Sequence, residues 1–166
     1  MTPRLARQFG PYKLLDRIAS GGMAEVHRAW RPSAGDRREV VAVKVVLPHC
    51  NDDQEFLEMM RDEARITSCL RHPNIATTYE WGDVEEQHYL AMEFIDGVDL
   101  RTLLSRCRKR GEHPPAEHVL RIVIDALLGL YAAHVALDEE GGPLNIVHRD
   151  VSPSNVLISF KGDVKV

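Results

Sequence analysis

Short runs of β-branched and aromatic residues, separated by polar turns, fill most of the first hundred positions. Five runs have this pattern: residues 12–18, 26–30, 40–46, 75–81 and 88–94. Runs of this length and composition predict strands. The polar residues 31–38, with Pro32 and Gly35, predict a turn between the second and third strands, and Gly82 with Asp83 predicts one between the last two.

Between the third and fourth runs, the apolar positions change to a spacing of three and four. The predicted helical face contains Phe56, Met59, Met60, Glu63, Thr67 and Leu70. Asn51, Asp52 and Asp53 supply a cap and an acidic first turn, and Pro73 is expected to end the segment.

From Leu100 onward the pattern predicts helix, first to about Arg110 and then over residues 115–136. The longer helix has a broad apolar face suited to burial, formed by Val119, Ile122, Val123, Ala126, Leu127 and Leu130. The change from strand to helix near Asp96 and Gly97 indicates two lobes joined by a short link. The fold class is therefore α+β.

Composition is that of a folded globular chain, with 44% hydrophobic and 28% charged residues among 166. The net charge of −4 gives no reason to expect nucleic acid as a partner. The basic residues 106–110 are interpreted as the solvated end of a helix, with a phosphate or acidic-peptide patch as the alternative. Cys50, Cys69 and Cys107 are odd in number and lack zinc spacing, which favours a reducing compartment.

No secretory signal follows the basic N-terminus, because no apolar run stands behind it. The most apolar stretch, residues 122–137, contains Asp125 and His134 and is too short to span a bilayer. We therefore expect no membrane segment in this chain.

Three short motifs could carry chemistry. The Gly21-Gly22 turn between two strands would let backbone N–H groups approach phosphate oxygens, although a plain hairpin turn explains it as well. Lys44 in an apolar strand and Glu63 on an apolar helical face each need a partner, and an ion pair at a cleft would satisfy both. An edge strand with Lys44 in solvent is the alternative.

The third motif is "HRDVSPSN", residues 148–155. The carboxylate of Asp150 can accept a hydroxyl proton or orient a nucleophile. The carbonyl of Asn155 can bind a hard cation such as magnesium. A plain loop is the alternative, since His, Asp, Pro and Asn are all common in loops.

In this order and spacing, the motifs resemble those of a eukaryotic-like, bacterial-type serine/threonine protein kinase. "GGMAEV" at residues 21–26 resembles the bacterial branch of the family, although only the middle glycine of the Gly-rich loop is kept, and "HPNI" at residues 72–75 matches the turn after the family's helix. The resemblance implies a kinase-like α+β fold, with a five-stranded antiparallel small lobe, one helix, and the first helices of a larger, mainly helical lobe. It implies an N-terminal extension (1–10) and a partial kinase domain (11–166), divided into small lobe (11–92), hinge (93–99) and start of the large lobe (100–166).

The resemblance also assigns an ATP site and a magnesium ligand. Lys44 would contact the α- and β-phosphates, and Glu63 would pair with it. Met92 would guard the back of the adenine pocket, the backbone of Glu93 and Ile95 would bind the base, and Asp99 would lie near the ribose. Asp150 would be the catalytic base and Asn155 the Mg²⁺ ligand. The remaining implied nucleotide contacts are Ile18, Ala19, Ser20, Gly21, Gly22, Met23, Ala24, Val26, Ala42 and Leu157.

Two departures affect the expected activity. Ser152 stands where most serine/threonine kinases have a lysine that contacts the γ-phosphate, and a hydroxyl cannot replace that charge. Pro153 is retained, so the tyrosine-kinase pattern is absent and serine/threonine is favoured. The family's Asp-Phe-Gly falls just beyond Val166, so we expect a truncated catalytic domain and no measurable transfer by the 166 residues alone.

The expected function is transfer of the ATP γ-phosphoryl group to Ser or Thr of a protein substrate. The alternatives are an ATP-binding pseudokinase or scaffold, an inactive fragment, and a small-molecule phosphotransferase of kinase-like fold. The expected location is the cytoplasm, for a separate kinase or for the cytoplasmic part of a longer, membrane-anchored one.

Overall fold

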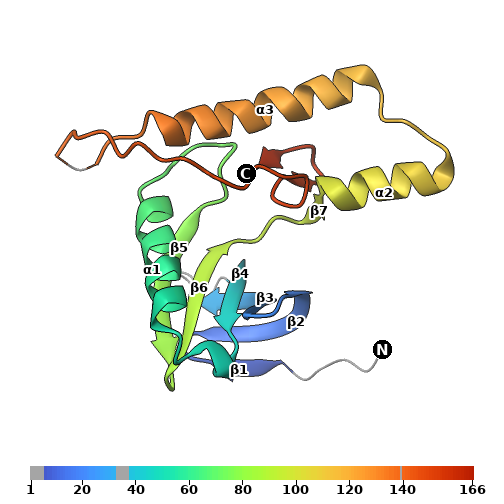
Figure 1. The fold of residues 1–166 in the computed structure, drawn as a ribbon. Helices are drawn as coiled ribbons and strands as arrows, with labels where there is room; N and C mark the ends of the chain where they lie inside the picture. The colour runs from blue at the N-terminus through green and yellow to red at the C-terminus, as the bar shows by residue number, and fades with distance from the viewer. Residues whose placement is uncertain (1–5, 33–37, 139) are drawn as a thin grey trace. The chain divides into compact units, whose positions relative to one another are not determined.

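Two compact units make up the computed structural model, which describes residues 6–32, 38–138 and 140–166. The first unit combines Met1–Ser68 with Thr77–Phe94, and the second combines Cys69–Ala76 with Ile95–Val166 (Figure 1). Most of the predicted turn at residues 31–38 lies outside the described residues.

An antiparallel six-stranded sheet forms the centre of the first unit, in the order β1-β2-β3-β4-β6-β5. Its strands are β1 (Arg7–Phe9), β2 (Tyr12–Ser20), β3 (Ala24–Pro32), β4 (Arg38–Val46), β5 (Thr78–Val84) and β6 (Gln87–Glu93). The five predicted strands are present, with the fourth shifted toward the C-terminus.

The sixth strand, β1, was not predicted. It pairs with the start of β2 through a tight turn in which Gly10 has a φ of 51°, a backbone conformation that favours glycine. Phe9 is 2% exposed and its ring meets Tyr89 edge-on at 5.6 Å. One aromatic side chain therefore anchors a strand too short and too basic to be recognised from its pattern.

The turn between β5 and β6 is formed by Glu85 and Glu86, not by Gly82 and Asp83 as predicted. Both glutamates have positive φ, 51° and 65°, which matches the twist of a two-residue hairpin turn. Gly82 lies within β5, where a Cβ atom would come 2.7 Å from the Tyr89 hydroxyl oxygen. The glycine marks a close approach to an aromatic side chain, and a turn signal was the wrong interpretation.

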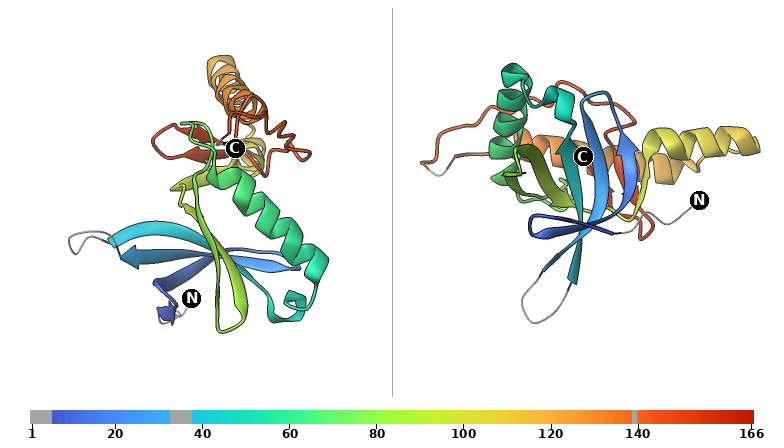
Figure 2. Two further views of the ribbon diagram at one scale, coloured as in Figure 1. Left: turned by 90° about the vertical axis from the view of Figure 1, so that its left-hand side faces the viewer. Right: turned by 90° about the horizontal axis from the view of Figure 1, so that it is seen from below.

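One helix, α1 (Gln54–Ser68), packs on one face of the sheet, after a 3-10 turn at Pro48–Cys50 (Figure 2). Its buried residues are Leu57, Met60 and Ala64. The predicted helical face is wrong at two positions, because Met59 and Glu63 are exposed. The helix also ends before Leu70, which is buried outside it.

The second unit contains both predicted helices, α2 (Leu100–Arg110) and α3 (Ala116–His134), which confirms that prediction to within two residues at each end. The basic residues 106–110 lie at the end of α2. A small antiparallel sheet, β7-β8-β9, joins β7 (Gly97–Asp99) to β8 (Leu157–Ser159) and β9 (Val164–Lys165). Residues separated by about sixty positions therefore lie side by side.

The apolar face of α3 is only partly buried. Ile122, Ala126 and Leu130 are half-buried, whereas Val119, Val123 and Leu127 are 42%, 48% and 58% exposed. Within the described part of the chain, no helix is both long enough and apolar enough to cross a membrane.

Three tyrosines should make the stability of the first unit depend on alkaline pH. The hydroxyls of Tyr12 and Tyr89 donate to the same Glu80 oxygen, at 2.7 and 2.8 Å, and that of Tyr79 donates to Glu39 at 3.2 Å. Burial, followed by the nearby glutamates, raises the pKa of all three above the ordinary value of 10.0.

Because the folded chain retains these protons longer than the unfolded chain, stability should be full below pH 10 and fall as pH rises above it. Each tyrosine contributes a slope of up to about 1.4 kcal/mol per pH unit. Urea unfolding between pH 8 and pH 12, about two units to either side of the ordinary tyrosine pKa, measures this slope. Tyr12→Phe should reduce the slope, whereas Tyr131→Phe, at an exposed position on α3, should leave it unchanged. A slope that Tyr12→Phe does not reduce would contradict the prediction.

Candidate functional site

Four of the predicted nucleotide-contacting residues share one face of the sheet in the first unit. Val26 of β3 lies directly opposite Lys44 of β4, and Ala42 of β4 lies opposite Met92 of β6. Since residues two apart on a strand point to the same side, all four side chains belong to one patch. A lysine among small and apolar side chains combines one cation with apolar surface, which suits a ring carrying phosphates.

The Gly-rich turn connects β2 to β3 next to this patch. Ala19 pairs with Val26, and Ser20 pairs with Glu25. The N–H of Gly21 donates to the Ala24 carbonyl at 2.9 Å, which closes the turn. Apart from its chain neighbours, no described residue lies within 4 Å of a Cβ built on Gly22, so this position leaves open space beside the backbone. The other predicted contacts here, Ile18 and Met23, are exposed.

The predicted ion pair between Lys44 and Glu63 is not formed in the described structure. Lys44 is half-buried, and Glu63 is exposed on α1, where its backbone carbonyl accepts the Thr67 hydroxyl at 2.7 Å. The expectation that Glu63 needs a partner failed because the helix turns it toward solvent, where water stabilises the charge.

Asp150 and Asn155 form the centre of the candidate site in the second unit. The Asn155 amide nitrogen donates to Asp150 Oδ2 at 2.8 Å and to the Asp150 backbone carbonyl at 3.0 Å. This arrangement leaves one side-chain oxygen available on each residue. Asp150 Oδ1 and Asn155 Oδ1 accept no hydrogen bond from the described residues.

The backbone holds this loop in place. Arg149 has a φ of 61°, and the Asp150 N–H donates to the His148 carbonyl at 2.8 Å. At its other end, the Arg101 N–H donates to the Pro153 carbonyl at 3.0 Å, which ties the loop to the start of α2. Ser152, the position where the family has lysine, accepts the Asn155 N–H through its carbonyl at 2.9 Å.

Asp99, predicted to lie near a ribose, is the N-cap of α2. Its two oxygens accept the Thr102 N–H at 2.8 Å and the Thr102 hydroxyl at 2.7 Å. Although partial burial raises the pKa of Asp99, these hydrogen bonds lower it overall. The spacing of Asp and Thr before an apolar run carries this capping signal, which the sequence interpretation missed.

The remaining predicted contacts have separate positions. Leu157 pairs with Asp99 across β7 and β8. The Glu93 carboxylate accepts the Thr77 N–H at 3.0 Å. Ile95 lies in the segment between the end of β6 and the start of β7. Its N–H and carbonyl make no backbone hydrogen bond with described residues. An unpaired donor and acceptor on an extended segment can bind the edge of a base.

A magnesium ion fits the donor set only in part. The free oxygens at Asp150 and Asn155 are of the hard type that Mg²⁺ prefers. No cluster of three or more His, Cys, Asp or Glu suited to a metal occurs in residues 6–32, 38–138 and 140–166. The ion would therefore need phosphate and water oxygens as further ligands, which is its usual mode of binding beside nucleotides.

Each unit thus brings together some of the predicted site residues. The first unit brings together Val26, Ala42, Lys44 and Met92, and the second brings together Asp150 and Asn155.

Several known proteins are similar to this chain. Residues 12–166 match the protein kinase domain model. The chain is 43% identical over 162 residues to the tyrosine-protein kinase MasK of Myxococcus xanthus, covering 98% of this chain and 25% of that protein. It is 36% identical over 172 residues to the serine/threonine-protein kinase PknA of Mycobacterium tuberculosis, covering 100% of this chain and 36% of that protein.

Among solved structures, the PknI kinase domain of M. tuberculosis superposes with a TM-score of 0.75 at 25% identity, over 97% of this chain and 59% of that one. The chain therefore spans only about a quarter to a third of the length of these curated relatives.

Proposed function

The chain belongs to the protein kinase family, and its relatives include bacterial serine/threonine kinases. We propose that it supplies the nucleotide-binding residues and the catalytic base of a serine/threonine protein kinase. The reaction is transfer of the γ-phosphoryl group of ATP to a Ser or Thr hydroxyl of a protein, with Mg²⁺.

The observation that carries the proposal is the Asp150–Asn155 pair. Asn155 Nδ2 holds Asp150 Oδ2 at 2.8 Å and so leaves Oδ1 as the acceptor for a substrate hydroxyl proton. The same contact leaves Asn155 Oδ1 without a hydrogen bond from the described residues, so this oxygen would bind the cation. When bound, Mg²⁺ neutralises phosphate charge; the chain's own residues orient the hydroxyl and hold its proton at Asp150.

On the first unit, Val26 and Ala42 would contact the adenine ring, and the Lys44 amine would bind the α- and β-phosphates. Met92 would close the inner end of the pocket, and the backbone of Glu93 and Ile95 would bind the base edge. Support comes from the shared strand face of the four side chains and from the Ile95 backbone, which makes no backbone hydrogen bond with the part of the chain that the structure describes. An ion pair between Lys44 and Glu63 would require the exposed Glu63 side chain to change position.

The roles proposed for Asp99, Leu157 and the Gly-rich turn remain, with a restriction at Asp99. Asp99 would contact a ribose only through oxygen lone pairs that Thr102 leaves free. Leu157 would add apolar surface against the ring. The Gly-rich turn, residues 18–26, would approach the phosphates through its backbone, since Gly22 leaves open space.

The acceptor residue needs a direct test, because one relative is named a tyrosine kinase and others are named serine/threonine kinases. The protein that carries this chain should be incubated with γ-labelled ATP, Mg²⁺ and a mixed protein substrate, followed by phosphoamino-acid analysis. We expect label on Ser and Thr. Lys44→Met should reduce incorporation about 10²-fold or more, whereas Lys13→Met, at an exposed strand position, should not.

Label on Tyr alone would overturn the serine/threonine assignment. Binding of ATP without any transfer would favour the pseudokinase or scaffold alternative, for which Ser152 in the lysine position is the specific observation.

A further inference from the structure

A cavity lies within the first unit, on the other side of the sheet from the proposed nucleotide patch. Its volume is about 430 Å³, within the range of small-molecule sites. Glu25 pairs with Val45 and both line it, whereas the next pair along the same strands, Val26 with Lys44, belongs to the patch. Because successive side chains of a strand alternate in direction, the two sites lie on opposite faces of β3 and β4.

The floor of this cavity is apolar and firmly packed. Phe9, Leu14 and Val45 are 2%, 6% and 6% exposed, and all three line it. Leu15 and Leu47 add half-buried apolar surface at its sides. A rigid apolar floor favours a ligand with an apolar body.

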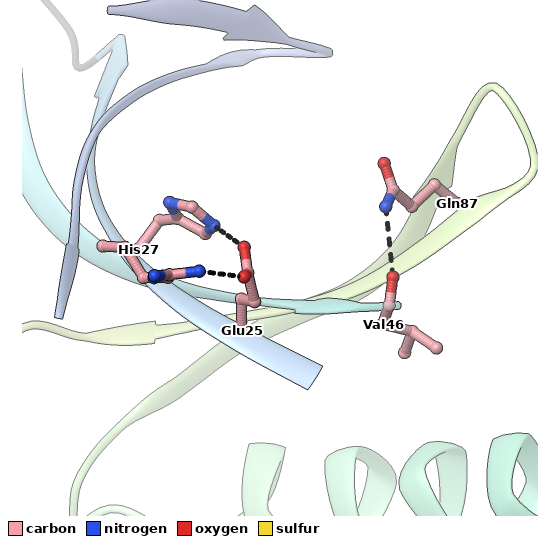
Figure 3. Close-up of polar contacts among 5 residues, drawn as sticks. Glu25, His27, Val46 and Gln87 are labelled. Carbon is pink, nitrogen blue, oxygen red and sulfur yellow. Dashed lines mark hydrogen bonds and ion pairs between the residues drawn. The ribbon is translucent and has the colours of Figure 1, made fainter. Parts of the chain in front are cut away.

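One wall is a fixed polar cluster (Figure 3). Both oxygens of the Glu25 carboxylate are occupied, Oε1 by the Arg17 guanidinium and Oε2 by the His27 ring nitrogen at 3.2 Å. The hydrogen bond from Arg17 lowers the pKa of Glu25, although some burial opposes it. Opposite, the Gln87 side-chain amide donates to the Val46 carbonyl at 3.1 Å. These polar groups are therefore ordered before any ligand arrives.

Positive charge exceeds negative charge around the cavity. Glu25 neutralises Arg17, but Arg7 forms no ion pair with any described residue. Its guanidinium lies over the Phe9 ring, 5.8 Å from the centroid, at the junction of the charged and apolar surfaces. A single excess guanidinium matches a monoanion; a multiply charged phosphate would be less well neutralised and would meet the Glu25 charge.

We propose that this cavity binds a small organic acid with one carboxylate and an apolar body the size of one or two rings. The carboxylate would bind Arg7 and the outward N–H groups of Arg17, and the body would cover Leu14, Val45 and Leu47. The site belongs wholly to the first unit and does not depend on phosphoryl transfer.

The test uses 2-naphthylacetate and its uncharged isostere 2-naphthylacetamide as probes. Binding to the ¹⁵N-labelled 166-residue chain is followed by NMR shifts of the Leu14, Val45 and Leu47 amides. For probes of this size we expect a Kd on the order of 1 mM. The acid should bind about tenfold more tightly than the amide, because one hydrogen bond becomes charge-assisted.

Two variants locate the site. Arg7→Gln should remove the tenfold preference for the acid, whereas Lys13→Gln, on the neighbouring strand but outside the cavity, should keep it. Leu47→Trp should fill the cavity and abolish the shifts from both probes, and retained shifts elsewhere in the spectrum would show that it still folds. Equal affinity for acid and amide, or an unchanged preference in Arg7→Gln, would overturn the proposal.

Discussion

An Asp150→Asn substitution is expected to reduce phosphoryl transfer by about 10²- to 10⁴-fold. The measurement requires the protein that carries this chain with the rest of its kinase domain. An asparagine oxygen can still accept the 2.8 Å hydrogen bond from Asn155, so the loop should keep its shape. It cannot hold a proton from the substrate hydroxyl, so the loss should fall on kcat and leave ATP affinity close to that of the unchanged protein.

Asp52→Asn is the matched control. Asp52 is an exposed carboxylate preceding α1, outside the described residues that form the candidate site, so the same chemical change there should leave kcat unaltered. A retained rate in Asp150→Asn, or a parallel loss of ATP binding, would refute the role given to Asp150.

The second large effect is expected at Gly97, where Ala should destabilise the second unit by about 1–3 kcal/mol. Gly97 pairs with Ser159 across β7 and β8. A Cβ atom there would overlap the Ile158 carbonyl oxygen and lie 2.7 Å from Ser159 Cα. Backbone atoms cannot rotate away as a side chain does, so the strands would have to separate.

Hydrogen exchange of the β7 and β8 amides, together with urea unfolding, measures this effect. Gly22→Ala serves as the control, because nothing lies within 4 Å of its Cβ position. Its stability should change by less than about 0.5 kcal/mol. Equal exchange rates in Gly97→Ala and the unchanged chain would show that the close approach is not maintained in solution.

The sequence predicted best where a local pattern was strong and uninterrupted. The limits of α2 and α3 follow from helical spacing and from breakers such as Gly111, which has a φ of 68° at the end of α2. The proximity of Asp150 and Asn155 follows from their separation by five residues in a turn. These features depend on neighbouring residues and can be seen without knowing the rest of the fold.

The failures have the opposite character. β1 exists because Phe9 reaches Tyr89, eighty positions away along the chain. The reason for a glycine at position 82 is the Tyr89 side chain, which the local sequence around Gly82 does not reveal. The exposure of Glu63 depends on how α1 packs against the sheet, which the helical spacing does not reveal. The cavity proposed to bind an organic acid is lined by residues from several strands, so no single segment of the sequence predicts it. Contacts between distant residues decide all four.

The short segment Cys69–Ala76 has a consequence for the order in which the chain folds during synthesis. It belongs to the second unit, although residues of the first unit flank it on both sides. Asn74 accepts the Val166 N–H at 2.9 Å, and the Ala76 N–H donates to Val166 at 3.0 Å. These partners are about ninety residues apart in the chain. At typical rates of protein synthesis, the ribosome therefore adds Val166 several seconds after Asn74 and Ala76. The first sheet can close once β6 has emerged, whereas Asn74 and Ala76 can form these hydrogen bonds only after Val166 has been synthesised.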